Sequence, residues 1–399
     1  MASVLISGAS VAGPTLAFWL HRLGHDVTVV EQSPAVRGGG YPIDLRGAAV
    51  DVIERMGVLG QVEASRTGTR RITFVDGRGR RIAVMDPELA AGTTGARAVE
   101  LPRGDLTRVL YDATRDDVEY VFSEEITGID DHGDGVDVTF RRSAPRAFDL
   151  VVGADGLHSN VRGLVFGPEA DFRHDLGRTY AGFSVPNAYG LDHEVLLSNT
   201  PGHLAALYAV RDEPEVTVLL AYAGPPPSAD HHDLEGRRAE VARASAGQSW
   251  HVPRLLDLMR AADDLYVDTV SQIRMPAWTR GRVALVGDAG YAPSFLSGQG
   301  TSLAVVGAYV LAAALAADPD PAIALPAHER TLRAFVERNQ SLVRSGSRIV
   351  LPTRRWELLA RNVLLRTVPL LARLGIGGDG GLAGAADTFV LPALSAPAR

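Results

Sequence analysis

The chain of 399 residues contains no cysteine, and all 40 of its Lys and Arg positions are arginine. The absence of cysteine excludes disulfides, thiolate metal ligands and a catalytic thiol. The absence of lysine excludes a Schiff base, a lysine general base and the lysine of a P-loop. Hydrophobic residues make up 46% of the chain, which is enough to bury a large core spread over two or three domains.

The chain also lacks a strong charge of one sign. Its formal net charge is -7 and its arginines are scattered, so we expect no nucleic-acid partner. No basic segment followed by an apolar one marks the N-terminus, where a strand at residues 4–6 leads into Gly8, and we expect a cytoplasmic protein. The longest apolar run, residues 301–317, is rich in alanine and short for a membrane span. It predicts a buried helix and no stable membrane insertion.

The order of apolar segments predicts an α/β protein. A strand at residues 4–7, a helix at 14–23 and a strand at 25–31 form one β-α-β unit. Four alternating segments between residues 180 and 222 predict an antiparallel sheet in a second domain. Further predicted segments are a hairpin at 71–74 and 80–84, amphipathic helices at 327–350 and 355–374, and a Gly- and Ala-rich tail from 376.

The first strand runs into a glycine turn, VLISGASVAGPTLA at residues 4–17. In dinucleotide-binding turns the first glycine allows a sharp bend, the second lets the backbone approach a diphosphate, and the third allows the helix to pack closely. Gly8 and Gly13 keep the outer roles, while Ser10 replaces the middle glycine with a small hydroxyl side chain. The helix that follows presents unpaired N–H groups to an anion. A turn of this kind can also serve packing alone.

Glu31 ends the second strand 18 residues after Gly13, where a carboxylate can accept hydrogen bonds from ribose hydroxyls. The alternative is an ordinary exposed acid. Two later segments, residues 149–162 and 281–311, repeat the pattern of an apolar strand that ends in glycine and aspartate, at Asp155 and at Asp288. Three separate strands with such ends predict that all three segments contact the same ligand.

Together these segments resemble the flavin-binding signatures of single-component FAD-dependent monooxygenases of the para-hydroxybenzoate hydroxylase type, in the shorter form without a thioredoxin-like domain. The resemblance covers about residues 1–345. It implies a Rossmann-like FAD-binding domain, a β-sheet substrate domain and C-terminal helices. It also implies bound FAD, NAD(P)H as a transient co-substrate, and O2. The expected reaction is hydroxylation of an aromatic or polyketide-like small molecule through a C4a-hydroperoxyflavin, by a monomer or homodimer.

Other reactions stay open on the same scaffold. The chain could be an epoxidase, a Baeyer-Villiger monooxygenase, an oxygen-independent flavin reductase or a nucleotide-binding sensor without turnover. A flavin-dependent halogenase is disfavoured, because the chain has neither a lysine nor a Trp-x-Trp segment.

The resemblance also implies which residues bind the cofactor. Asp288 would bind the ribityl chain, and the helix that begins near Thr301 would direct its positive end at the reduced flavin ring. Relatives carry a histidine and two prolines after the Gly-Asp pair, whereas this chain has Tyr291 and keeps one proline. The implied cofactor-binding residues are Gly8, Ser10, Val11, Ala12, Gly13, Glu31, Gln32, Arg37, Arg46, Arg103, Asp155, Gly287, Asp288, Pro293, Gly298, Gly300 and Thr301.

The implied domains are discontinuous. Residues 1–72, 98–172 and 266–320 would bind FAD, residues 73–97 and 173–265 would bind substrate, and residues 321–399 would form the C-terminal helices and tail. We assign no catalytic base, although Arg46, Tyr208 and His203 are polar candidates, and we expect no metal site. The candidate substrate-lining residues, for which plain core packing is the alternative, are Phe183, Leu196, Leu207, Tyr222 and Phe295.

Overall fold

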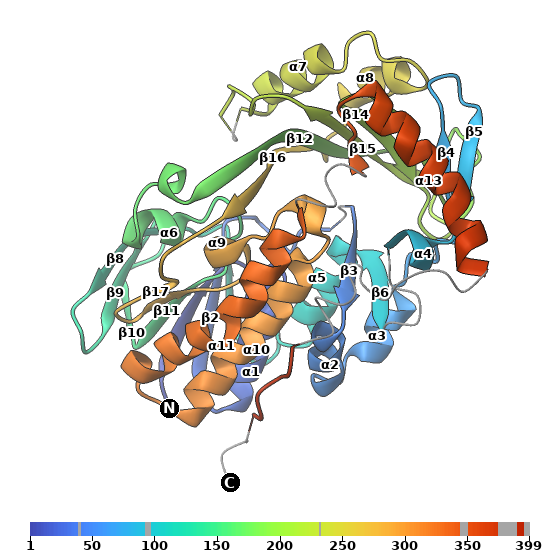
Figure 1. Cartoon of the computed structure of the whole chain (residues 1–399). Helices are drawn as coiled ribbons and strands as arrows, with labels where there is room; N and C mark the ends of the chain where they lie inside the picture. The colour runs from blue at the N-terminus through green and yellow to red at the C-terminus, as the bar shows by residue number, and fades with distance from the viewer. Residues whose placement is uncertain (39–40, 92–96, 231–232, 344–349, 374–388, 395–399) are drawn as a thin grey trace.

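The computed structural model describes residues 1–38, 41–91, 97–230, 233–343, 350–373 and 389–394. Two large β-sheets dominate the architecture, and Figure 1 shows the N-terminal sheet with its helices below an arched second sheet. Helices and strands are mixed throughout the chain. The α/β class predicted from the sequence is confirmed.

The lower sheet is parallel through its centre, with the strand order β17-β18-β11-β1-β2-β7. The short β17 runs antiparallel to β18. Residues of β1 such as Leu5 and Ile6 are fully buried, as expected for a parallel sheet with both faces covered. Its strands are β1 (Ser3–Ser7), β2 (Asp26–Glu31), β7 (Glu119–Phe122), β11 (Leu150–Gly153), β17 (Thr279–Arg280) and β18 (Val283–Leu285).

Helix α10 (Gly300–Ala317) lies inside this domain, against α1 (Ala12–Arg22), α2 (Ala48–Arg55) and α11 (Pro321–Ser341). By length and composition it is the one helix in the described part of the chain that could cross a membrane. However, 72% of its residues are buried inside the protein. A helix that is apolar all round and surrounded by other elements is a core helix.

The upper sheet has the strand order β16-β12-β15-β14-β13-β4-β5. All of its neighbouring strands are antiparallel except β13 and β4, which are parallel. Helices α7 (Leu234–Ala244) and α8 (Val252–Met259) pack on its outer face. The strands are β4 (Arg71–Val75), β5 (Arg81–Met85), β12 (Arg173–Pro186), β13 (Glu194–Thr200), β14 (His203–Tyr208), β15 (Glu215–Ala223) and β16 (Tyr266–Ile273).

Smaller elements complete the fold. Strands β3 and β6 pair with each other, and β8, β9 and β10 form a small sheet. The remaining elements are β3 (Pro42–Arg46), β6 (Ala98–Pro102), β8 (Ile126–Asp131), β9 (Val136–Phe140), β10 (Arg146–Phe148), α3 (Leu59–Ala64), α4 (Pro87–Ala91), α5 (Arg103–Asp112), α6 (Asn160–Val165), α9 (Asp288–Tyr291), α13 (Arg355–Arg373), and the 3-10 turns η1 (Glu169–Asp171) and η2 (Phe295–Ser297).

Strand β16 and helix α11 are two of the elements that differ from the sequence prediction. Strand β16 was not predicted, because its polar residues Asp268 and Gln272 are buried and hide the usual alternation. The helix predicted at 327–350 begins instead at Pro321 and ends at Ser341. The Asp320 side chain accepts a hydrogen bond from the Ala322 N–H at 2.9 Å and caps the earlier start. Residues 344–349, and residues 374–388 of the predicted tail, lie outside the described ranges.

Tyr291, which stands where the resemblance implies a histidine, is fully buried. Its ring centroid lies 4.5 Å from that of Trp278. Its hydroxyl lies against α10, where a Cβ atom on Gly307 would come within 1.9 Å of it. Tyr291 is therefore a packing residue between α9 and α10.

We predict that Gly307→Ala destabilises the protein, because the added methyl group overlaps the Tyr291 hydroxyl. Overpacking costs about 1–3 kcal/mol, which exceeds the gain of about 1 kcal/mol from alanine's helix propensity. The control is Gly163→Ala in α6, where an added Cβ meets no atom within 4 Å. Urea unfolding measures both variants. Equal stability changes in the two would contradict the packing role.

Candidate active site

Three glycine turns meet at the carboxyl ends of neighbouring parallel strands in the lower sheet. Strand β1 pairs with β11, and β11 pairs with β18. Backbone hydrogen bonds of 2.8 Å from Ala154 N to Ser7 O and 2.9 Å from Val286 N to Gly153 O fix the ends together. Ligands of open parallel sheets bind in the crevice at this edge. The segments that the sequence analysis treats as returning to one ligand are therefore adjacent in space.

Gly8 and Gly13 are required by close backbone approach. Gly8 has φ +110°, and a Cβ atom there would lie 2.5 Å from Ala154 O. A Cβ atom on Gly13 would lie 1.9 Å from Gly8 O. The turn is therefore held directly against the start of α1, with Val11 as its N-cap and Ala12 as its first residue.

The N-terminus of α1 is arranged for an anion. Val11 supplies no side-chain cap, and the first turn contains no acidic residue. The leading N–H groups are thus not neutralised by the helix's own side chains. Ser10 faces the cavity, and its Oγ accepts a hydrogen bond from Arg103 Nη2 at 3.1 Å. The position that lacks the middle glycine thereby carries a hydroxyl beside a guanidinium.

Glu31 is fixed at the end of β2. One carboxylate oxygen accepts from Ala9 N and the other from Ser33 N, each at 2.9 Å. Arg37 lies 3.9 Å from the same carboxylate, and both side chains line the cavity with Gln32. Each carboxylate oxygen has a second acceptor site. Glu31 therefore organises the turn and can still accept hydrogen bonds from a ligand.

The cavity beside these residues has a volume of about 580 Å³, within the usual range for ligand pockets. It extends from the glycine turn to the edge of the upper sheet. Its lining from the first two turns includes Ser7, Gly8, Ala9, Ser10, Ala154, Asp155 and Gly156, and its lining from the upper sheet and neighbouring loop includes Gly182, Phe183, Ser184, Thr217, Asp264 and Tyr266.

Asp155 and Arg162 stabilise the second turn. Asp155 accepts hydrogen bonds from Ser159 Oγ at 2.5 Å and Val161 N at 3.0 Å. Burial raises the pKa of Asp155, and these hydrogen bonds oppose the rise. Arg162 is fully buried and donates to Ala289 O at 2.8 Å, which ties the second turn to the third. Arg162 thus has a structural role, and Asp155 combines such a role with a place in the cavity wall.

The third turn carries Asp288, and we call the space that this side chain faces the hollow; no residue of this turn lines the cavity described above. Asp288 is exposed to solvent although surrounding protein raises its pKa by desolvation, an effect that Arg103 opposes. Among the described residues none donates a hydrogen bond to its carboxylate. A Cβ atom on Gly300 would lie 3.6 Å from Asp288 Oδ1, which places Asp288 beside the first residue of α10. Gly287, at φ +69°, brings this turn against Ala12 of α1.

The polar residues around the start of α10 are joined by hydrogen bonds and an ion pair. Arg46 is 4% exposed, its N–H donates to Ser302 Oγ at 3.1 Å, and its Nη2 lies 2.7 Å from Asp44 Oδ2. Gly298 adopts a left-handed conformation at φ +62° just before α10. Pro293 O accepts a hydrogen bond from Gln272 Nε2 at 2.9 Å and does not line the cavity in the described structure.

An aromatic cluster lies between the cavity and the inner face of the upper sheet. Phe295 stacks on Tyr180 at 4.3 Å between ring centroids and meets Tyr41 edge-on at 5.0 Å. Tyr180 lies 5.9 Å from Tyr266. Tyr41 and Tyr266 line the cavity, while Tyr180 and Phe295 belong to the inner-face cluster.

The predicted substrate residues fall on two faces of the upper sheet. Phe183, Leu207 and Tyr222 belong to the core beneath α7 and α8, and Leu196 pairs with Leu207 on that same side. These four therefore lie on the outer side of the sheet, although Phe183 reaches the cavity edge, and their role as substrate contacts stays a prediction. Phe295 lies on the inner side. The inner face of the sheet carries Tyr180, Leu204, Ala206, Tyr208, Leu219, Ala221 and Val270.

The two polar catalytic candidates on β14, His203 and Tyr208, lie on opposite faces of the upper sheet. His203 Nε2 lies 3.0 Å from Ala244 O of α7, so its ring is on the outer side, away from the hollow. Tyr208 is on the inner side, where burial raises its pKa and the nearby Glu100 and Asp44 add to the rise. Burial and Asp44 also raise the pKa of Glu100, which accepts a hydrogen bond from Thr69 Oγ1 at 3.0 Å.

The sequence analysis misses four polar residues near the cavity and the inner face of the upper sheet: Tyr41, Asp44, Glu100 and His158. Asp44 has a detectable signal, because it lies two positions before Arg46 on an alternating strand and so shares its face. His158 lies inside the second motif, at GADGLH. Tyr41 and Glu100 carry no local signal, since their partners come from distant segments.

His158 joins the cavity wall to the upper sheet. Its Nε2 lies 3.1 Å from Asp268 Oδ2 and its Nδ1 3.1 Å from Glu169 Oε1. Burial lowers the pKa of His158, but the hydrogen bonds and charges of Asp268 and Glu169 outweigh it and raise the pKa to about 9. Tyr266 also donates to Asp268, at 2.7 Å.

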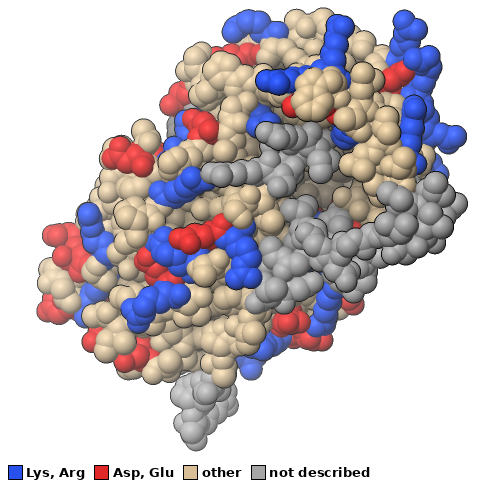
Figure 2. Space-filling view, in the orientation of Figure 1, with Lys and Arg blue, Asp and Glu red and all other residues tan. Residues whose placement is uncertain are grey.

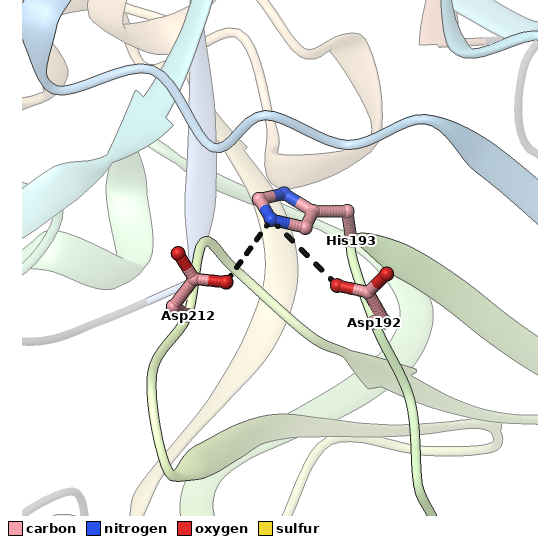
Figure 3. Close-up of side chains that lie close together, drawn as sticks. All are labelled: Asp192, His193 and Asp212. Carbon is pink, nitrogen blue, oxygen red and sulfur yellow. Dashed lines mark ion pairs between the residues drawn. The ribbon is translucent and has the colours of Figure 1, made fainter.

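A cluster of one histidine and two aspartates, Asp192, His193 and Asp212, lies on loops at one end of the upper sheet (Figure 3). His193 Nε2 is 3.7 Å from an Asp192 oxygen and 3.5 Å from an Asp212 oxygen. Its Nδ1 lies 3.0 Å from Gly68 O. The two carboxylate side chains, of Asp192 and Asp212, are 67% and 98% exposed. The geometry is that of a surface ion-pair cluster, and we assign it no metal.

Comparison with known proteins defines the family. Residues 1–320 match the model of the FAD binding domain family. The chain is 47% identical to an uncharacterized protein of Mycobacterium tuberculosis (strain H37Rv), over 86% of this chain and 93% of that protein. It is 37% identical to a flavin-dependent monooxygenase from an unknown prokaryotic organism, over 85% and 87%. The crystal structure of tetracycline destructase Tet(55) superposes with TM-score 0.84 and 34% identity, over 98% of both chains.

The chain therefore belongs to the FAD-binding flavin-dependent monooxygenases, and it is an oxidoreductase that binds FAD. The suspected resemblance is confirmed at the level of the family. The residues present fit the cofactor: a glycine cradle, an uncapped helix N-terminus and a fixed carboxylate meet at one cavity.

We predict that Glu31→Ala weakens FAD binding by about 10- to 100-fold, because one change removes a ligand acceptor and two charge-assisted hydrogen bonds that hold the turn. Fluorescence titration of the apoprotein with FAD measures this. The control is Asp116→Ala, an acid whose side chain is 88% exposed. Unchanged FAD affinity in Glu31→Ala would contradict the assignment.

We predict that the His158 ion pairs stabilise the fold at low pH and are lost at high pH. The folded pKa of about 9 exceeds the unfolded value of about 6.5, so the contribution is complete below about pH 6.5 and disappears as the pH rises through about 9. It amounts to about 3 kcal/mol at most. Urea unfolding of the protein and of His158→Gln at pH 6.5 and 9.5 measures it. The same pH dependence in both proteins would refute the linkage.

Proposed function

We propose that the protein uses NAD(P)H and O2 to hydroxylate an aromatic or polyketide-like small molecule, in the cytoplasm and as a monomer or homodimer. The observation that carries the proposal is the meeting of the three strand-end turns, the first two of which line a cavity that reaches the upper sheet. This arrangement suits one extended cofactor that connects a nucleotide site to a substrate site.

We assign the adenosine half of FAD to the first turn. Glu31 would hold the ribose, while Ser10 and the N-terminus of α1 would hold the diphosphate. Arg103 would stabilise the diphosphate through the guanidinium that already contacts Ser10. Asp288, exposed to the hollow, would accept a hydrogen bond from a ribityl hydroxyl.

We assign the flavin ring to the hollow at the start of α10. The 18-residue helix has no side-chain cap at Gln299 and no acid in its first turn, so its positive end can stabilise an anionic ring. Bound FAD supplies the redox chemistry that activates O2. The protein's part is to orient the substrate and exclude water, for which the aromatic rings of Tyr41, Tyr180 and Phe295 are suited.

The inner face of the upper sheet is our candidate substrate surface. It is mostly apolar, with Tyr180, Leu204 and Leu219 among its residues. Opposite it, Glu100 and Asp44 offer carboxyl groups near Tyr208. A polycyclic substrate with hydroxyl groups fits this combination, and the similarity to a protein titled a tetracycline destructase supports a substrate of that kind.

We predict that the purified protein is yellow and oxidises NAD(P)H slowly alone, faster with an accepted aromatic substrate, and with equal consumption of O2. An oxygen electrode and absorbance at the nicotinamide band measure both rates, and mass spectrometry locates the added oxygen.

The outcomes separate the alternatives. Substrate-dependent oxidation of NAD(P)H that continues without O2 would replace the proposal with a reductase. Oxygen inserted into a ring bond or across a double bond would replace hydroxylation with Baeyer-Villiger or epoxidation chemistry. A bound flavin without any turnover on a broad aromatic panel would favour a sensor.

A further inference from the structure

Helix α13 has an inverted amphipathic pattern. The face packed on the upper sheet includes Arg361, which is 5% exposed, donates to Asn199 Oδ1 at 2.6 Å and lies over the Phe74 ring. Leu365, one turn further, is also buried. The solvent side carries large apolar residues instead. These are Trp356, Leu359, Val363 and Leu364, with exposures of 62%, 67%, 61% and 47%.

We name these four residues the outer stripe of α13. Their spacing places them along one side of a helix. Single exposed hydrophobic residues are ordinary, but neighbouring ones on one helix face indicate a surface that contacts something apolar. Helix α13 is held firmly in this orientation, since Arg361 anchors it to β13 and Arg366 Nε donates to Ile82 O of β5 at 3.2 Å.

The surroundings of the outer stripe are basic. Figure 2 shows blue side chains gathered at the end of the molecule where Figure 1 places β5 and α13. The exposed arginines of α13 and of the adjoining β4-β5 hairpin are Arg354, Arg355, Arg366, Arg78, Arg80 and Arg81. This corner has the opposite sign to the chain as a whole, whose net charge is -7.

The few acids near these arginines leave the corner positive. The Asp76 carboxylate is occupied by Arg80 and by the N–H groups of the hairpin turn. Glu357 accepts from Thr353 N and Arg354 N, and these hydrogen bonds lower its pKa. A second copy of the chain is a poor occupant, because a two-fold contact would set the arginines of one α13 against those of the other.

We propose that the outer stripe and its arginine rim bind the protein peripherally to an anionic membrane surface. Apolar side chains of an interfacial helix enter the boundary between headgroups and acyl chains, while arginines contact lipid phosphates. Trp356 has the residue type that favours this boundary. The contact is peripheral, since α13 is packed on the sheet along its other side. This membrane binding is a property beyond the proposed oxygenation reaction and does not depend on that reaction.

Vesicle co-sedimentation of the full-length protein tests the proposal. We expect binding to vesicles of phosphatidylglycerol and phosphatidylcholine in equal parts, weak binding to phosphatidylcholine alone, and weakening as salt screens the arginines. Leu359→Asp should reduce partition by about tenfold or more, and Arg81→Glu with Arg355→Glu by about tenfold. Emission from Trp356 should shift to the blue on binding, and the shift should vanish in Trp356→Phe.

The control is Ile323→Asp, which places the same charge at a 52% exposed apolar position on α11, outside the outer stripe. It should bind vesicles like the unchanged protein, and circular dichroism confirms that each variant is folded. Equal loss in Leu359→Asp and Ile323→Asp would overturn the proposal. So would absence of vesicle binding, or a dimer in light scattering that Leu359→Asp converts to a monomer, since the stripe would then be a contact between copies.

Discussion

The close approach of the β1 turn to the β11 turn is the constraint on which the rest of the site depends. Gly8 lies so near Ala154 O, and Gly13 so near Gly8 O, that a single Cβ atom at either position would separate the strand ends or lift α1 from the sheet. Because these backbones touch, the first turn and the second turn line one cavity. Glu31 completes the arrangement by bonding to Ala9 of the turn.

The third turn extends this site across the domain. Gly287 rests on Ala12, so the start of α10 is positioned relative to the start of α1. Arg103 links the two sites. It donates a hydrogen bond to Ser10, and its positive charge opposes the desolvation that raises the pKa of Asp288. Two helix N-termini are thus held in fixed positions relative to each other. This suits a ligand with a diphosphate at one end and a ring that gains negative charge at the other.

The sequence predicts much of this because glycine turns, strand ends and carboxylates at strand ends obey local rules. It does not predict which apolar residues face the hollow. Phe183 and Tyr180 lie on opposite faces of β12, and both faces are buried. The alternation of side chains along this strand therefore does not indicate which face is turned toward the hollow. Strand β16 is equally hidden, since Asp268 and Gln272 find partners in His158 and Pro293 from distant segments. Glu100 and Asp44 come together only through the pairing of β3 with β6.

The most direct test is a crystal structure of the protein with bound FAD. The account predicts the diphosphate at the N-terminus of α1, a ribose hydroxyl within hydrogen-bond distance of Glu31, and the flavin ring beside the first residues of α10. FAD bound with its diphosphate away from the turn between Gly8 and Gly13, or a ring that does not reach α10, would contradict it.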